Sequence, residues 1–287
     1  MKKIILATRG SALAMAQSEE VKNKLLKVDP ELEIEFLEVV TSGDKDRKSS
    51  LSAIGGNGLF VRGIEEKLLS GEADIAVHSA KDLPYEIAEG LIIAGAPAQA
   101  DCRDVIISKV PEADIKVIGT GSPRRIIEVK KQFPNAEIKE IRGNITTRVR
   151  KLREEDYDAI IIAAAGIERI DIDLSGLNVR KFDTEEFIPA ACQGILAVEC
   201  RKEDQEIRKL LADTTEYETM LRFEMERYLF GKLKADCSVP MGIHAEVNNY
   251  EVKLSAMFRG KYVHEECVVT DWKRVADKMV EELCLDE

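Results

Sequence analysis

The chain has 287 residues, of which 45% are hydrophobic and 33% charged, so it is long enough for two or three compact domains with buried cores. Its formal net charge of -11 disfavours a general nucleic-acid or anionic-membrane binder, and no apolar run approaches the roughly 18 residues of a membrane-spanning helix. The apolar stretch at the start is too short for a signal sequence, so we expect a cytoplasmic protein with reduced cysteines.

The first hundred residues alternate short apolar runs with helical spacing, which predicts a parallel or mixed sheet covered by helices. Strands are expected at residues 3–8, 34–40 and 73–77. Ser11 is expected to cap a helix whose buried positions recur every four residues, and a second helix is expected over residues 60–69. The third strand runs directly into the polar residues 78–84, at the carboxyl end of a strand, where open α/β sheets bind ligands.

The next ninety residues repeat this arrangement. Strands are expected at residues 104–108, 116–119, 136–141 and 158–164. The polar residues 120–125 and 142–144 each follow a strand and open a helix, which aims backbone N–H groups and arginine side chains at an anion site. Residues 116–153 hold eleven Lys or Arg and only three acidic residues, so an acidic protein carries one cationic segment. Two similar halves indicate a cleft between them.

The remaining residues predict a small α+β domain. They show a helical pattern over residues 215–230, a loop over 231–240, three alternating strand-like runs and a final helix from residue 272 to about 283. The three histidines and six cysteines of the chain have no metal-binding spacing, and we therefore expect no metal site.

Few single residues indicate a function by themselves. Taken alone, Asp82 is more typical of a turn or cap than of a catalytic residue, and Cys237 is more typical of a buried inert thiol than of a nucleophile. The glycine-rich residues 55–58 match neither the dinucleotide nor the phosphate-loop pattern. A group of arginines at predicted element boundaries favours an anion site over a solvated face, because guanidinium groups bind carboxylates at two points. These are Arg124, Arg125, Arg142 and Arg148.

Seven segments together resemble the porphobilinogen deaminase family, and their order and spacing match from near residue 3 to residue 284. They are residues 7–11, 58–60, 73–84, 119–125, 142–144, 193–194 and 237–240. The string His-Ser-Ala-Lys-Asp-Leu-Pro at residues 78–84 is more specific to this family than any glycine motif. The resemblance implies a monomeric transferase that joins four porphobilinogen molecules head to tail into hydroxymethylbilane and releases ammonia.

The same resemblance implies an α/β fold with two periplasmic-binding-protein-like lobes and a small α+β C-terminal domain. Domain 1 would comprise residues 1–98 and 193–213, domain 2 residues 99–192, and domain 3 residues 214–287. Cys237 is similar to the cysteine that holds a dipyrromethane cofactor through a thioether. Asp82 matches the catalytic carboxylate, whose charge would stabilise the positive charge left on the substrate after ammonia departs.

The other site residues also follow from the resemblance. Cofactor-binding positions are matched by Lys81, Asp82, Thr120, Ser122, Arg124, Arg125, Arg142 and Gly143. Substrate-binding positions are matched by Arg9, Ser11, Phe60, Arg148 and Gln193. Porphobilinogen bears acetate and propionate groups, so the growing product is a polyanion that suits a lining of arginines. No metal, nucleotide, nucleic acid or membrane is implied as a partner.

The chain departs from the family pattern in a few places. Asn57 and Ala53 stand where relatives carry lysine, and Cys192 stands where relatives carry glycine, which puts a second thiol near the site by analogy. Two other interpretations remain open. A two-lobed anion receptor without catalysis would need neither the third domain nor Cys237, and a nucleic-acid-binding protein that uses the cationic segment is disfavoured by the net charge.

Overall fold

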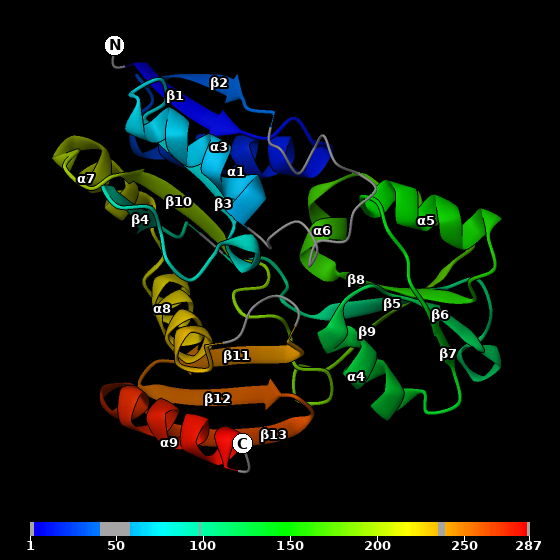
Figure 1. Cartoon of the computed structure of the whole chain (residues 1–287). Coiled ribbons are helices and arrows are strands. Elements are labelled where there is room, and N and C mark those ends of the chain that lie inside the picture. Colours follow the sequence, from blue (N-terminus) through cyan, green and yellow to red (C-terminus); the bar gives the residue numbers. More distant parts are fainter. Residues whose placement is uncertain (1–2, 41–57, 98, 235–238, 286–287) are drawn as a thin grey trace. The chain divides into compact units, whose positions relative to one another are not determined.

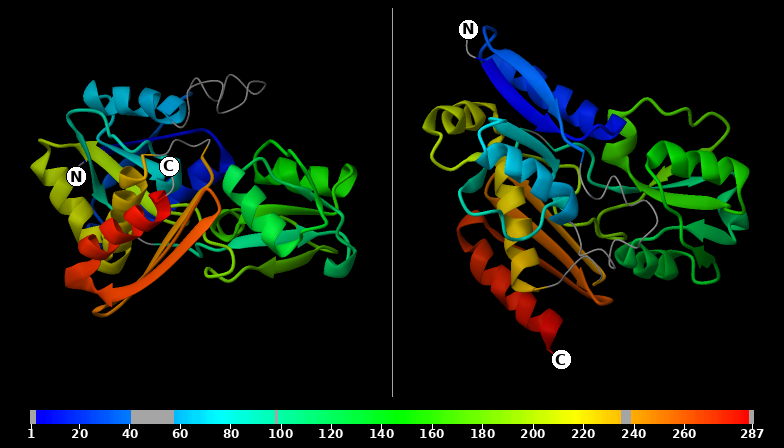
Figure 2. Two further views of the ribbon diagram at one scale, coloured as in Figure 1. Left: turned by 60° about the horizontal axis from the view of Figure 1, so that its bottom comes forward. Right: turned by 45° about the horizontal axis from the view of Figure 1, so that its top comes forward.

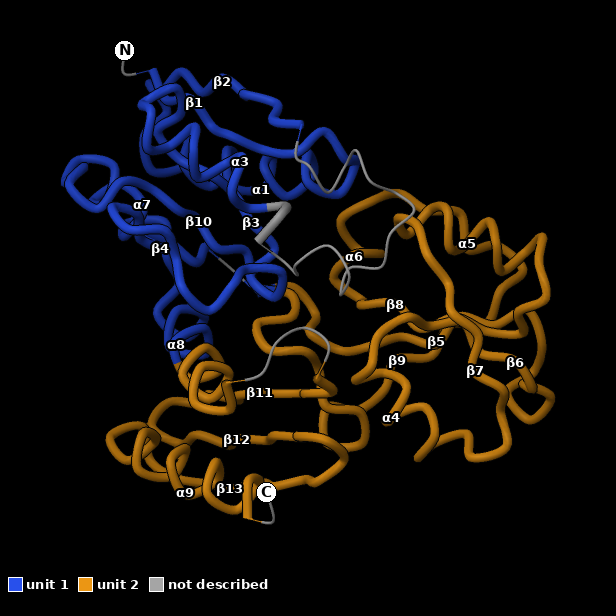
Figure 3. The backbone as a smooth tube through the Cα atoms, viewed as in Figure 1, with its two compact units in different colours: residues 1–99, 195–224 blue, residues 100–194, 225–287 orange. Residues whose placement is uncertain are grey.

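The computed structural model describes residues 3–40, 58–97, 99–234 and 239–285, with the backbone alone at residues 58–60. By its internal contacts the chain divides into two compact units, which have different colours in Figure 3. Unit 1 comprises residues 1–99 and 195–224, and unit 2 comprises residues 100–194 and 225–287. None of the described helices is long and apolar enough to cross a membrane.

Unit 1 is built on a five-stranded mixed sheet with the strand order β2-β1-β3-β10-β4 (Figure 1). Its strands are β1 (Lys3–Thr8), β2 (Glu33–Glu38), β3 (Ile75–Ser79), β4 (Leu91–Gly95) and β10 (Leu196–Arg201). β1 is parallel to β2 and β3, whereas β10 is antiparallel to β3 and β4. Parallel neighbours need crossover connections, and α1 (Ala12–Val28) and α3 (Gly58–Leu69) supply them.

Helices cover both faces of this sheet. α1 and α7 (Gln205–Thr214) bury Val21 and Leu211 against one face, and α3 buries Ile64 and Leu68 against the other. Each such side chain contributes about 1.5–3 kcal/mol when it is fully withdrawn from water. Because both faces are covered, ligands have access to the sheet only at the ends of its strands.

The first part of unit 2 contains a second five-stranded sheet, with the order β7-β6-β8-β5-β9. Its strands are β5 (Asp104–Ser108), β6 (Val117–Gly119), β7 (Glu137–Lys139), β8 (Ala159–Ala163) and β9 (Asn178–Lys181). α4 (Pro123–Gln132) buries Val129 against one face, and α5 (Ile145–Glu154) buries Val149 and Leu152 against the other. A shorter helix, α6 (Ala164–Arg169), follows β8 directly.

The second part of unit 2 is a three-stranded antiparallel sheet with helices on one face. Its elements are β11 (Met241–Asn248), β12 (Glu251–Phe258), β13 (Lys261–Val268), α8 (Tyr217–Lys232), which begins in unit 1, and α9 (Trp272–Cys284). The rings of Tyr228 and Trp272 meet edge to face at 5.2 Å, and the Tyr228 hydroxyl donates to Asp277 at 2.9 Å. α8 and α9 therefore lie on the same face of the sheet, as both views in Figure 2 show.

These sheets confirm the expected α/β class with a small C-terminal α+β part. The strand expected over residues 3–8 has those bounds, and the four strands expected between residues 104 and 164 are all present, three of them shorter than expected. β4, β9 and β10 were not among the expected strands. β10 pairs with β3 and β4, which lie far earlier in the chain, and no local pattern reveals that pairing. The division into three domains stays a prediction.

Candidate functional site

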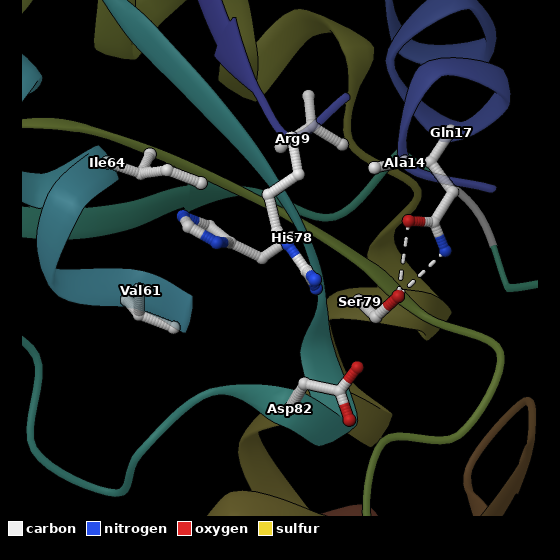
Figure 4. A pocket seen from close by; sticks show the side chains of 9 residues that line it. Arg9, Ala14, Gln17, Val61, Ile64, His78, Ser79 and Asp82 are labelled. Carbon is white, nitrogen blue, oxygen red and sulfur yellow. Dashed lines mark hydrogen bonds between the residues drawn. The ribbon is translucent and has the colours of Figure 1, made fainter. Parts of the chain in front are cut away.

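Asp82 lies at the carboxyl end of β3, where the strand continues into the short 3₁₀ helix η1 (Ala80–Asp82). The residue is exposed and lines an open pocket of unit 1. The pocket is lined by Arg9, Ala14, Gln17, Val61, Ile64, Val77, His78, Ser79 and Asp82. Figure 4 shows the Arg9 side chain extending towards Ser79 and Asp82. The structure thus brings two predicted site residues, a guanidinium and a carboxylate, into one pocket.

Polar contacts hold the start of α1 beside β3. The Ser11 hydroxyl accepts a hydrogen bond from the Ala14 backbone N–H at 3.3 Å, which confirms the predicted helix cap. Further along the helix, the Gln17 side-chain amide donates to the Ser79 hydroxyl at 2.7 Å. The bond from Gln17 ties α1 to β3, and the cap at Ser11 fixes the start of the helix that follows Arg9.

A buried contact between a histidine and a carboxylate lies at the pocket wall. His78 Nε2 is 2.9 Å from Glu199 Oε2, and both residues are buried. Burial, and secondly the nearby Glu199 charge, raise the pKa of Glu65 on α3. Sequence reasoning missed Gln17 and His78 as pocket residues. The position of His78, four residues before Asp82 in the same polar cluster, was the signal that could have found it.

In unit 2 the helices α4 and α5 both begin inside the cationic segment with side-chain caps. The Ser122 hydroxyl accepts from the Arg125 backbone N–H at 3.5 Å, and the Thr120 hydroxyl accepts from the Ser122 N–H at 3.2 Å. The Asn144 side chain accepts from the Thr147 N–H at 2.8 Å. Each helix start carries partial positive charge, which favours an anion.

Two arginines lie beside the start of α5. Arg142 is exposed, and its Nε is 2.7 Å from a carboxylate oxygen of Glu140. Arg148 is half-buried, and its Nε donates to the Gly143 carbonyl at 2.8 Å. Burial, and secondly the nearby charge of Arg125, lower the pKa of Arg148 to about 10.

Gly143 follows Arg142 directly, and its carbonyl accepts the hydrogen bond from Arg148. Its backbone has a conformation that favours glycine. Its φ is +118°, and a Cβ there would lie 2.6 Å from the Cγ2 of Thr147. A side chain at this position would therefore collide with the first turn of α5. The absence of one leaves the backbone open beside Arg142 and Arg148.

Arg124 and Arg125 differ from the other predicted site arginines because both are buried and share one carboxylate. Arg124 Nη1 and Arg125 Nη2 lie 2.8 and 2.7 Å from the two oxygens of Asp104, which has no exposed surface. Arg125 Nη1 also donates to the Ile161 carbonyl at 2.9 Å. Burial lowers the pKa of Arg125, and the Asp104 charge opposes this effect. Direct contact of these two arginines with the cofactor stays a prediction.

Replacing Asp104 by Asn is expected to destabilise the protein by about 3–5 kcal/mol, because two buried guanidinium charges would lose their shared counterion. The measurement is the midpoint of chemical unfolding, followed by circular dichroism. The exposed Asp114 is the matched control, and Asp114→Asn is expected to change stability by less than about 0.5 kcal/mol. Equal midpoints for the two variants would contradict a structural role for Asp104.

Gln193 is buried, and its side-chain amide donates to the Cys102 carbonyl at 2.7 Å. The preceding residue, Cys192, has a φ of +60°, in the left-handed region that favours glycine. Its backbone N–H donates to the Glu226 carboxylate. Burial, and secondly the Glu226 charge, raise the pKa of the Cys192 thiol well above its usual value. The second thiol is therefore a poor nucleophile at neutral pH.

Some predicted positions lie outside the described residues. These are Cys237, Asn57 and Ala53, and of Phe60 only the backbone in α3 is described. Lys81 is half-buried in η1, next to Asp82. Over the described ranges, no group of three or more His, Cys, Asp or Glu side chains is arranged to hold a metal ion.

Two family models match the chain. Residues 4–209 match porphobilinogen deaminase, dipyromethane cofactor binding domain, and residues 220–278 match porphobilinogen deaminase, C-terminal domain. The chain is 41% identical to the porphobilinogen deaminase of Macrococcus caseolyticus over 94% of this chain and 89% of that protein. It is 37% identical to the porphobilinogen deaminase of Streptococcus sanguinis over 99% of this chain and 96% of that protein.

Solved structures show a more distant similarity. One is a periplasmic binding protein of Salmonella typhimurium with high arginine specificity, with a TM-score of 0.44 and 10% identity over 78% of this chain and 98% of that chain. Another is the periplasmic VFT2 domain of BvgS from Bordetella pertussis, with a TM-score of 0.42 and 16% identity over 74% of this chain and 86% of that chain.

Proposed function

This chain belongs to the porphobilinogen deaminase family, and we propose that Asp82 is its catalytic carboxylate and Cys237 the attachment point of its cofactor. The enzyme is a transferase of tetrapyrrole biosynthesis that joins four porphobilinogen molecules head to tail into hydroxymethylbilane and releases ammonia. The observation that carries the role of Asp82 is its exposed position beside Arg9, in the pocket at the carboxyl end of β3.

Asp82 supplies the negative charge that the reaction needs. Loss of ammonia from porphobilinogen leaves positive charge delocalised over the pyrrole ring and its methylene carbon. A carboxylate that accepts the pyrrole N–H stabilises this charge as it develops, and groups of this kind contribute about 3–4 kcal/mol to transition states. The same oxygen atoms are able to carry a proton to the departing amine and to take one from the attacked pyrrole carbon.

The substrate carboxylates are bound by a second set of groups. Arg9 and Ser11 lie at the start of α1 in unit 1, next to the pocket that holds Asp82. Arg148 in unit 2 offers a guanidinium from the start of α5. Guanidinium forks match the acetate and propionate groups of porphobilinogen. We assign substrate binding to Arg9, Ser11, Phe60, Arg148 and Gln193.

The residues at the starts of α4 and α5 suit the carboxylates of a dipyrromethane. Gly143 has no side chain to block the approach, and Thr120 and Ser122 carry hydroxyl groups in the same cationic segment. When bound, the dipyrromethane supplies the pyrrole carbon to which the first substrate is joined. We assign it to Lys81, Asp82, Thr120, Ser122, Arg124, Arg125, Arg142 and Gly143, with a thioether to Cys237.

Further properties of the family extend the proposal. The enzyme acts as a monomer in the cytoplasm, without nucleic acid or membrane as a partner. Its chain forms three domains, which comprise residues 1–98 with 193–213, residues 99–192, and residues 214–287. The two units found here differ from this division in that unit 2 holds both the second sheet and the three-stranded sheet.

The activity is tested by incubating the purified protein with porphobilinogen and measuring ammonia and hydroxymethylbilane together. Four molecules of ammonia are expected for each hydroxymethylbilane formed. Intact mass spectrometry of the same sample is expected to show one dipyrromethane above the sequence mass. An anion receptor would bind porphobilinogen without releasing ammonia and would have the unmodified mass, so that result would refute the proposal.

A further inference from the structure

The thiol of Cys102 lies against a buried histidine in unit 2, in a cluster that the catalytic assignments do not use. Cys102 is half-buried, and its Sγ is 3.9 Å from His244 Nε2, within hydrogen-bonding reach for sulfur. His244, on β11, is only 5% exposed. Its other ring nitrogen, Nδ1, is 3.5 Å from Oε1 of Glu226 on α8. A thiol, an imidazole and a carboxylate thus form a row.

The surrounding carboxylates favour the protonated form of His244. Glu226 is 1% exposed, and Glu246, also on β11, lies 3.5 Å from His244 Nε2. Burial lowers the pKa of His244, but the contacts with Cys102, Glu226 and Glu246 outweigh it and raise that pKa well above the usual value. These contacts favour an imidazolium beside the sulfur, and a nearby cation favours the thiolate over the thiol.

The other charges near the thiol largely balance one another. Asp101 lies one residue before Cys102, and its carboxylate contacts Arg103 at 2.6 Å and Lys181 at 2.7 Å. Glu246 shares the Nε2 side of His244 with the sulfur and is about half exposed to water, which weakens its repulsion of a thiolate. The ring of His244 is the ionisable group for which a direct contact with the sulfur is seen.

We propose that Cys102 is an activated thiol that exchanges with small-molecule disulfides to form a reversible mixed disulfide. The Cys102 thiolate attacks one sulfur of the disulfide, a new S–S bond forms and the old one breaks. The second sulfur leaves as a thiolate and takes up one proton from the solvent. This proton balances the one that Cys102 released to the solvent when its thiol ionised. A reducing thiol reverses the exchange.

The position of Cys102 connects this modification to the packing of unit 2. The Cys102 carbonyl receives the hydrogen bond from Gln193, and Glu226 binds both His244 and the backbone N–H of Cys192. These residues lie close to the three places where the chain passes between the units. The contacts of Cys102, Cys192 and Glu226 hold their three segments together within unit 2. A sulfur adduct on Cys102 therefore alters the packing among these segments. The inference goes beyond the proposed catalytic function and does not depend on it.

The test measures the reaction of the holoenzyme with a dipyridyl disulfide at pH 6, with peptide mass mapping to locate each adduct. Cys267 is the internal reference, because it is also half-buried and because burial, and secondly the Asp271 charge, raise its pKa. Cys102 is expected to react at least about tenfold faster than Cys267, because its sulfur contacts the His244 ring whereas burial disfavours the Cys267 thiolate. A Cys102 rate no higher than that of Cys267 would overturn the proposal.

Two substitutions separate the effect of His244 from general accessibility. In His244→Gln the Cys102 rate at pH 6 is expected to fall about tenfold, because the imidazolium is lost. In Glu246→Gln it is expected to fall less than in His244→Gln, because the imidazole and its contact with Glu226 remain while a negative charge near the sulfur is removed. An unchanged rate in His244→Gln would overturn the role of His244.

If His244→Gln does not fold, the pH dependence of the Cys102 rate in the unmodified chain tests the same role of His244. With His244 beside the sulfur, the Cys102 rate is expected to rise less steeply between pH 7 and pH 8 than the Cys267 rate, which rises about tenfold as its thiolate fraction grows. A tenfold rise for Cys102 over this interval would contradict an activated thiol. Peptide mapping keeps this result separate from the state of Cys237.

Discussion

Replacing Asp82 by Asn is expected to lower kcat of the holoenzyme by about 10²–10³-fold while folding and cofactor attachment stay intact. The substitution preserves the size of the side chain and removes the charge that stabilises the electron-deficient substrate. Because Asp82 is exposed at the end of η1, little packing is lost. The measurement is steady-state release of ammonia from porphobilinogen, with intact mass and the thermal midpoint recorded for the same preparation.

Glu86 provides the matched control for this substitution. It is exposed four residues further along the chain, so Glu86→Gln removes the same charge from the same part of unit 1. Its kcat is expected to stay within about twofold of the unmodified enzyme, because exposed substitutions away from a site have small effects. Near-normal turnover in Asp82→Asn would refute the catalytic role. Loss of the dipyrromethane in that variant would instead indicate a role in cofactor attachment.

Replacing Cys237 by Ser is expected to eliminate both the dipyrromethane and the turnover. A hydroxyl group is not ionised at neutral pH, is a much weaker nucleophile than a thiol and cannot form a thioether. The intact mass of the variant is expected to equal the mass of its sequence. Ammonia release from porphobilinogen is expected to fall to the background of a protein-free sample, because no covalent starting point is present.

Other thiols of the chain serve as controls for Cys237→Ser. Cys267→Ser and Cys284→Ser each remove one half-buried thiol, and both variants are expected to keep the mass increment and the turnover. If Cys237→Ser still carries a covalently bound dipyrromethane, the attachment belongs to another thiol, which peptide mass mapping of the variant would identify. That result would contradict the assignment made from the resemblance.

Local patterns predicted most of the fold because they depend on neighbouring residues. The helix capped by Ser11 was predicted from a polar residue that precedes buried positions spaced four residues apart. β1 was predicted from a short apolar run. The expected final helix begins at Trp272, as the structure has it. β10 and its antiparallel pairing with β3 were not predicted, because the partner strand lies 117 residues or more before it in the sequence.

The candidate site was predicted in part. The position of Asp82 at the end of a strand, and the placement of Ser122 and Gly143 at helix starts, followed from polar residues that come directly after apolar runs. The joining of Arg9 and Asp82 in one pocket required the parallel pairing of β1 with β3. Gln17 and His78 were missed because a glutamine in a helix and a single histidine carry no distinctive pattern.

The order of residues along the chain was enough to identify the family, the α/β class, the helix caps and the cationic segment. The helix caps depend on side chains within a few residues of one another, and the family follows from the order of seven short segments along the chain. Folding in three dimensions was needed to show that Arg124 and Arg125 share the buried Asp104, and that Cys102 meets His244 from 142 residues away. A charge or thiol in the sequence has no fixed partner, because its partner is set by which distant segments the core packs together.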